Sequence, residues 1–203
     1  MRRWYLSSAL FAASLFALWL PTQHPDATAL ASGPIPTRPL NTRVDPNQSV
    51  TLIVLDTSGS MKEEGDTVAS YLRTQGTGLV GLITYSDSAR MLIQPSQSIA
   101  AREAALGALN WRGGSNMYAG LDTALNWFRQ HSTGGRILLV SDGSINVGQV
   151  DPMIVAALGR EASSLGVVID VLQISVPLSP VLDVLASKSR GEVRVWSDSG
   201  SSL

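Results

Sequence analysis

The stretch that decides the fold is VTLIVLDTSGSM, at residues 50–61. Residues 50–55 are apolar or β-branched at every position, which is typical of a strand that is buried on both faces of a sheet. The next residues place Asp56, Ser58 and Ser60 at alternate positions. The stretch therefore predicts a central strand that ends in a loop of short, oxygen-bearing side chains.

Further buried strands and amphipathic helices alternate along the rest of the chain. The expected strands are at residues 79–85, 137–140 and 167–174, with a short last one at 192–196; the expected helices are at 99–109, 117–131, 153–165 and 179–189. Such alternation indicates parallel β-α-β units.

One strand departs from this parallel pattern. Residues 89–94 follow the strand at 79–85 after the turn Ser86-Asp87-Ser88, which predicts a hairpin. The predicted fold is therefore α/β: a doubly wound, mostly parallel central sheet with one antiparallel edge strand and helices on both faces.

The N-terminal region has the features of an export signal. Arg2 and Arg3 precede a charge-free apolar run at residues 4–20, and A-x-A patterns follow at 27–29 and 29–31. Residues 1–31 are therefore expected to be a signal peptide or a retained membrane anchor, and we favour cleavage. The protein is expected in a bacterial periplasm, or in the inner membrane facing it.

A proline-rich segment separates this region from the rest of the chain. Residues 32–48 contain Pro34, Pro36, Pro39 and Pro46 and predict an extended linker. The folded domain is expected to occupy residues 49–203.

Composition narrows the possible functions. The chain has no cysteine, which excludes disulfides, zinc–thiolate sites and thiol nucleophiles, and it has only 2 histidines. The formal net charge is −1, and no basic run is present, so no nucleic-acid partner is expected.

Three loops at the expected carboxyl ends of the strands carry short polar side chains. The first holds Asp56, Ser58 and Ser60; the second holds Ser115, in a Gly-Gly-Ser-Asn loop before a helix; the third holds Asp142, in Ser-Asp-Gly after a strand. Ligands of doubly wound sheets bind at this edge, where the strand order reverses. We expect the three loops to meet there.

Carboxylates and hydroxyls without imidazole or thiol suit a hard cation that prefers oxygen ligands. Mg²⁺ is the expected ion, with Mn²⁺ and Ca²⁺ as alternatives. Because these side chains do not complete an octahedron, a remaining position could accept a carboxylate from another molecule.

Together, the three motifs resemble the metal-ion-dependent adhesion site (MIDAS) of von Willebrand factor A (VWA) domains, over about residues 48–196. The resemblance implies a Rossmann-like VWA fold and a module for protein–protein interaction. It also implies that Ser58, Ser60 and Ser115 contact the metal directly and that Asp56 and Asp142 act directly or through water. A Glu or Asp of a protein partner would complete the shell.

The sequence departs from this family pattern in two ways. Ser115 stands where the family usually has Thr, so the hydroxyl is kept but the methyl that restricts its rotamer is lost. The sequence also ends without the long closing helix of many members, so affinity switching by movement of that helix would need another chain.

Other interpretations of the same residues stay open at this stage. Asp56, Ser58 and Ser60 could each cap a helix. Trp111 and Arg112 could form an exposed interface pair, or the tryptophan could be buried.

Two other functions are compatible with the same sequence. The domain could be a scaffold or assembly factor for an envelope complex or an exported metalloenzyme, with the cation only structural. A hydrolase is the minor alternative, because no G-x-S-x-G elbow or Walker A motif occurs and His131 lies at the far end of a helix. We therefore expect binding rather than catalysis.

Overall fold

A computed structural model of the chain describes residues 50–74, 78–147, 151–174 and 177–196. The predicted signal segment or anchor (1–31) and the predicted linker (32–48) lie outside these residues. Within the described ranges, no helix combines the length and the apolar content that a membrane crossing requires.

A six-stranded sheet forms the centre of the domain, in the order β3-β2-β1-β4-β5-β6. Only β2 and β3 pair in antiparallel fashion, and the other neighbours are parallel. This confirms the predicted fold class, with β3 as the antiparallel edge strand. The strands are β1 (Val50–Asp56), β2 (Leu79–Tyr85), β3 (Ala89–Ser96), β4 (Gly135–Ser141), β5 (Val167–Ile174) and β6 (Val193–Trp196).

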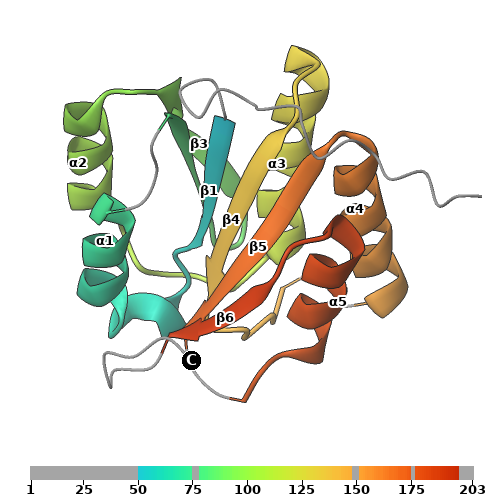
Figure 1. The fold of residues 1–203 in the computed structure, drawn as a ribbon. Helices are drawn as coiled ribbons and strands as arrows, with labels where there is room; N and C mark the ends of the chain where they lie inside the picture. Colours follow the sequence, from blue (N-terminus) through green and yellow to red (C-terminus); the bar gives the residue numbers. More distant parts are fainter. Residues whose placement is uncertain (1–49, 75–77, 148–150, 175–176, 197–203) are drawn as a thin grey trace, which may run out of the picture. The chain divides into compact units, whose positions relative to one another are not determined.

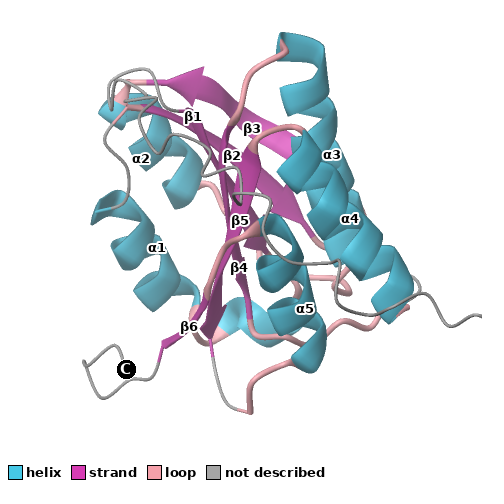
Figure 2. Cartoon of the chain, turned by 45° about the vertical axis from the view of Figure 1, so that its right-hand side comes forward, coloured by secondary structure: helices cyan, strands magenta, loops and turns pink. Residues whose placement is uncertain are grey.

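Helices cover both faces of this sheet, as Figures 1 and 2 show. One face carries α3 (Met117–His131), α4 (Pro152–Ser164) and α5 (Pro180–Ser189). The other carries the short 3-10 helix η1 (Gly59–Lys62), α1 (Gly65–Thr74) and α2 (Ile99–Gly107). Each face has its own buried apolar cluster, and the first contains Met117, Leu121, Leu125 and Phe128 of α3.

Strand order reverses between β1 and β4. From β1 the chain moves outward through β2 and β3, then returns to β4 beside β1 and moves outward in the other direction through β5 and β6. The connections that leave the carboxyl ends of β1 and β4 therefore run toward opposite sides. This is the point at which doubly wound sheets bind their ligands.

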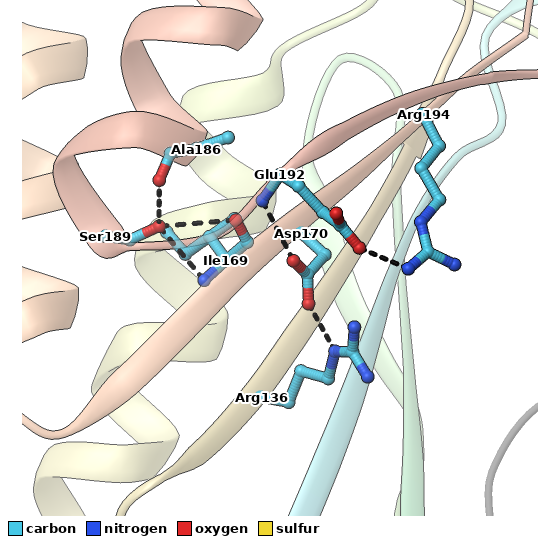
Figure 3. Close-up of polar contacts among 7 residues, drawn as sticks. All are labelled: Arg136, Ile169, Asp170, Ala186, Ser189, Glu192 and Arg194. Atoms are coloured by element: carbon cyan, nitrogen blue, oxygen red, sulfur yellow. Dashed lines mark hydrogen bonds and ion pairs between the residues drawn. The ribbon is translucent and has the colours of Figure 1, made fainter. Parts of the chain in front are cut away.

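Polar contacts hold the short strand β6 to the sheet (Figure 3). The buried carboxylate of Asp170 accepts a hydrogen bond from the Glu192 amide at 3.0 Å and pairs with the guanidinium of Arg136. Ser189, at the end of α5, accepts from the Ile169 amide at 3.0 Å and donates to the Ala186 carbonyl at 2.9 Å. These bonds fix the turn from α5 into β6.

Close packing of α3 against the sheet depends on Gly120. A Cβ atom at this position would lie 2.7 Å from the Tyr85 ring and 2.9 Å from a methyl group of Val54. These distances are shorter than any ordinary carbon–carbon contact, so only glycine allows the helix to lie this close to β1 and β2. The helix begins at the loop that carries Ser115, and Gly120 therefore helps to place that loop.

We expect Gly120→Ala to lower the free energy of unfolding by about 1–3 kcal/mol, because the added methyl must displace core atoms. Gly107→Ala is the matched control: it also lies in a helix, but a Cβ there meets nothing within 4 Å. At position 107 the better helix propensity of alanine should raise the free energy of unfolding by up to about 1 kcal/mol. Urea unfolding of both variants measures the difference; equal effects would contradict this packing account.

Candidate functional site

The carboxyl ends of β1 and β4 bring three loops together. Asp56 is the last residue of β1 and Ser141 the last residue of β4, and Ser115 lies two residues before α3 begins. All three side chains are buried, with exposures of 0%. The expected meeting of the loops at this edge is thus found in the structure.

Asp56 is the centre of this arrangement. Its Oδ2 accepts hydrogen bonds from the Ser115 hydroxyl at 2.7 Å and from the Ser141 hydroxyl at 3.0 Å. Its Oδ1 accepts from the Ser58 amide at 2.9 Å. The Ser58 hydroxyl lies 3.1 Å from that of Ser60. Four of the five predicted site residues are therefore linked in one chain of contacts.

Asp142, the fifth predicted residue, directly follows Ser141 and is half-buried. Its Oδ1 accepts a hydrogen bond from the Ser144 amide at 2.8 Å, which tightens the loop that leaves β4. The bond from this loop to Asp56 is made by Ser141. The structure thus places Asp142 at the same edge of the sheet, one residue from the cluster.

Backbone bonds join the loop after β1 to the loop that carries Ser115. The Gly59 amide donates to the Gly113 carbonyl at 3.1 Å, and the Arg112 amide donates to the Thr57 carbonyl at 2.9 Å. Thr57 also donates from its own amide to the Tyr85 carbonyl at 2.8 Å. The separation between Asp56 and Ser115 is therefore fixed by main-chain contacts as well as by their own hydrogen bond.

Two further side chains hold the Ser115 loop from its outer side. Asp87, in the β2–β3 turn, accepts from the Gly114 amide at 2.8 Å, and Asn146 accepts from the Ser115 amide at 2.7 Å. Gly113 has a φ of +85°, and a Cβ there would lie 2.7 Å from an Asp87 oxygen. Glycine is therefore required for the loop to approach Asp87 in this conformation.

The Asp56 carboxylate is buried, and no ion pair to it is found in the part of the chain that the structure describes. The ion pairs found among the described residues lie elsewhere on the domain. Burial raises the pKa of Asp56 above its ordinary value of 3.8, and the hydrogen bonds from Ser115, Ser58 and Ser141 oppose this rise. A buried carboxylate that lacks a counter-charge is costly to ionise. A bound cation beside Asp56 would supply the positive charge that would stabilise its ionised form.

The donor set suits a hard cation. No group of three or more His, Cys, Asp or Glu side chains that could hold a metal occurs in the described part of the chain. The cluster instead combines the Asp56 carboxylate with neutral hydroxyl oxygens, and Asp142 lies one residue away; such oxygens are ligands of Mg²⁺ and Ca²⁺ and are poor ligands for softer metals. The residues present are therefore compatible with the predicted ion.

Sequence reasoning overlooked Tyr85 and gave little weight to Ser141. Tyr85 ends β2 and is 1% exposed, and its hydroxyl has no hydrogen-bond partner among the residues that the structure describes. Burial, followed by the charge of Asp56, raises the pKa of Tyr85, and the hydroxyls of Ser141 and Ser115 oppose this rise, so these side chains are its neighbours. The one signal in the sequence was the position of both residues at the carboxyl end of an apolar strand.

The structure also decides between the interpretations left open above. Ser58 occupies the N-cap position of η1 but makes no side-chain capping bond. Asn116 does cap its helix, accepting from the Ala119 amide at 3.2 Å. Trp111 is half-buried and packs over Gly65, whereas Arg112 is exposed. The tryptophan therefore forms part of the support of α1, and the two residues do not form a fully exposed pair.

Comparison with known proteins relates this arrangement to a family. Residues 51–144 match the model of the von Willebrand factor type A domain. This segment contains the loops that carry Asp56, Ser115 and Asp142. Comparison with curated protein sequences returns no match.

Several solved structures have a similar fold. An aerotolerance-related membrane protein from Bacteroides fragilis is 16% identical, with a TM-score of 0.59 over 74% of this chain and 92% of that one. The protein BatB from Bacteroides thetaiotaomicron is 14% identical, with a TM-score of 0.59 over 74% and 91%. A von Willebrand factor type A protein from Catenulispora acidiphila is 21% identical, with a TM-score of 0.60 over 75% and 39%. At these identities the similarity is one of fold.

In the presence of chelator, we expect the stability contributed by Asp56 to fall as pH rises. Its folded pKa is raised above 3.8, so the folded protein binds the proton more tightly than the unfolded chain does. The contribution is complete below 3.8 and is lost as pH rises through the raised folded pKa. Urea unfolding of wild type relative to Asp56→Asn, at a series of pH values, measures it. A relative stability that increases with pH would contradict the raised pKa.

Proposed function

We propose that the chain is a metal-dependent protein-interaction module that works outside the cytoplasm. The premise is its similarity to von Willebrand factor type A domains. Domains of this family generally mediate protein–protein interactions. The proposed partner is a protein that offers a Glu or Asp side chain to a divalent cation at the Asp56 cluster. Mg²⁺ is the proposed ion, with Mn²⁺ and Ca²⁺ as alternatives.

The observation that carries the proposal is the environment of Asp56. Hydroxyl oxygens from two other loops surround this buried carboxylate, and none of the described ion pairs includes it. A site that only stabilised the fold would be expected to pair such a carboxylate with Arg or Lys. Convergence of neutral oxygens on an unpaired buried acid favours a bound cation as the missing charge.

Five residues are proposed to hold the cation: Asp56, Ser58, Ser60, Ser115 and Asp142. Ser60 is exposed and Asp142 is half-buried, whereas Asp56, Ser58 and Ser115 are buried. The accessible side of the site is therefore the side of Ser60 and Asp142. A partner carboxylate is proposed to approach from there, since a divalent ion with two protein carboxylates still favours further oxygen ligands.

The proposed role is binding without turnover. His131, one of the two histidines of the chain, stacks on Trp127 with ring centroids 4.0 Å apart and contacts the Trp127 carbonyl at 2.8 Å. It lies at the end of α3 opposite to Ser115, so it is poorly placed to act as a base there. This supports the expectation that the chain is not an enzyme.

Titration of metal-stripped protein with MgCl₂ tests the site. At a concentration 100 times the Kd, binding should add about 2.7 kcal/mol to the free energy of unfolding. Asp56→Ala, Ser115→Ala and Asp142→Ala should lose this increment, because each removes a proposed oxygen ligand. Thermal unfolding with and without the ion measures it, and MnCl₂ and CaCl₂ establish the preference.

Two variants serve as matched controls for this titration. Ser164→Ala removes an exposed hydroxyl at the end of α4, and Glu103→Ala removes an exposed carboxylate that pairs with Arg73 in α1. Both should keep the full metal-dependent increment. If the melting temperature of wild-type protein is the same with each ion as with chelator, the cluster is not a cation site.

Partner capture distinguishes the proposal from the second function, a scaffold or assembly factor in which the cation is only structural. A pull-down from native envelope extract, run in parallel with Mg²⁺ and with chelator, should lose the partner in chelator. The captured partner should also be lost with Ser115→Ala and kept with Ser164→Ala. Capture that persists in chelator with folded protein would favour the scaffold function.

Export is part of the proposal and has its own test. Fusion of the full chain to alkaline phosphatase should give enzyme activity in a bacterial host, because this reporter is active only after export, and deletion of residues 1–31 should abolish it. Recovery in the soluble envelope fraction would indicate cleavage, and recovery in membranes an anchor. An active fusion after the deletion would contradict the assignment of residues 1–31 as the export signal.

A further inference from the structure

Hydrogen bonding at Asp56 is saturated on one oxygen and unsaturated on the other. Oδ2 accepts two hydroxyl protons, from Ser115 at 2.7 Å and from Ser141 at 3.0 Å. These two bonds use both lone pairs of a carboxylate oxygen. Oδ1 accepts the Ser58 amide at 2.9 Å, which leaves one lone pair of this oxygen for another contact.

A third hydroxyl lies near the same carboxylate and has no hydrogen-bond partner among the described residues. The Tyr85 hydroxyl neighbours Ser141, Ser115 and Asp56, the residues that make the two bonds to Oδ2. It is buried and makes no hydrogen bond. An unbonded buried hydroxyl destabilises the folded state, so a fold with no use for it would be more stable with phenylalanine at this position.

Tyr85 is also held firmly in this place. Its ring packs against α3 at Gly120, and its carbonyl accepts bonds from the amide and the hydroxyl of Thr57, at 2.8 and 3.0 Å. Burial, followed by the nearby charge of Asp56, raises the pKa of Tyr85 well above its ordinary value. The phenol therefore keeps its proton and can act only as a neutral hydroxyl.

We propose that Tyr85 is a positioning residue of the cation site: its hydroxyl is a reserve hydrogen-bond donor that takes a place on Asp56 Oδ2 when a serine hydroxyl leaves it. The inference rests on the proposed function in that the serine that leaves is Ser115, when it turns its oxygen toward a cation. Tyr85 then keeps Asp56 fully hydrogen-bonded, and the carboxylate keeps its orientation.

The reserve role has a consequence that needs no metal. Ser141→Ala removes one of the two donors from Oδ2, so Tyr85 should replace it in the variant. In chelator, Ser141→Ala should therefore lower Tm less in wild-type protein than in protein that carries Tyr85→Phe. Tyr85→Phe alone should leave Tm unchanged or raise it, because it removes an unbonded buried hydroxyl. Tyr71→Phe, in α1, is the matched control background.

The second measurement is the affinity of the protein for Mg²⁺. Loss of a group that orients a metal ligand typically weakens metal affinity by roughly 10- to 100-fold. MgCl₂ titration of Tyr85→Phe should show a loss of this size, and Tyr71→Phe should show none. In protein labelled with ¹³C at tyrosine Cζ, the Tyr85 resonance can be assigned because it is absent from the spectrum of Tyr85→Phe. In wild-type protein this resonance should shift on addition of MgCl₂.

These experiments separate the inference from the function on which it rests. Additive Tm effects of Ser141→Ala and Tyr85→Phe in chelator, or a large destabilisation by Tyr85→Phe alone, would overturn the reserve donor. So would an unchanged Mg²⁺ affinity in Tyr85→Phe when the wild type binds the ion. If the wild type binds no cation while the chelator cycle shows coupling, the proposed function fails and the exchange of donors at Oδ2 stands.

Discussion

The structure depends on one constraint, which is that a buried carboxylate at the end of the central strand must be satisfied. Asp56 is fully buried, and its three hydrogen bonds come from its own loop, from the loop before α3 and from the end of β4. A donor that moved away would leave a charge or a hydroxyl unbonded in a medium of low polarity. The three loops are therefore held in one arrangement, and the reversal of strand order between β1 and β4 is what brings them to the same place.

Support for this arrangement is distributed over elements that contribute no proposed ligand. The β2–β3 turn holds the Ser115 loop through Asp87, and the segment after β4 holds it through Asn146. Gly120 lets α3 lie against Tyr85. The site is thus rigid on its inner side, toward the sheet, and open toward Ser60 and Asp142. A cluster of oxygens with one accessible side is compatible with the proposed cation, which in turn would bind the acidic group of a partner.

Family similarity and physical chemistry contribute different parts of the interpretation. The family model covers residues 51–144, and the solved structures, at identities of 14–21%, establish the fold. Neither identifies the proposed ion or the proposed partner. Those rest on the chemistry of the cluster: hydroxyls and carboxylates without imidazole or thiol, and a buried acid without a counter-charge among the described residues. The assignment of Tyr85 likewise comes from the saturated hydrogen bonding of one carboxylate oxygen.

The sequence by itself determined the fold class, the antiparallel edge strand and the loops of the site, because each is a local signal: buried strands are continuous apolar runs, and polar residues follow where they end. It also identified Asp56, Ser58, Ser60, Ser115 and Asp142 as candidates. Only the tertiary structure decided that Ser141 bonds to Asp56 and that the Tyr85 hydroxyl is left without a partner. Both depend on the register between strands and on the direction of individual side chains. Asp56 and Ser141, for example, are 85 positions apart in the sequence and meet only because the sheet brings them together.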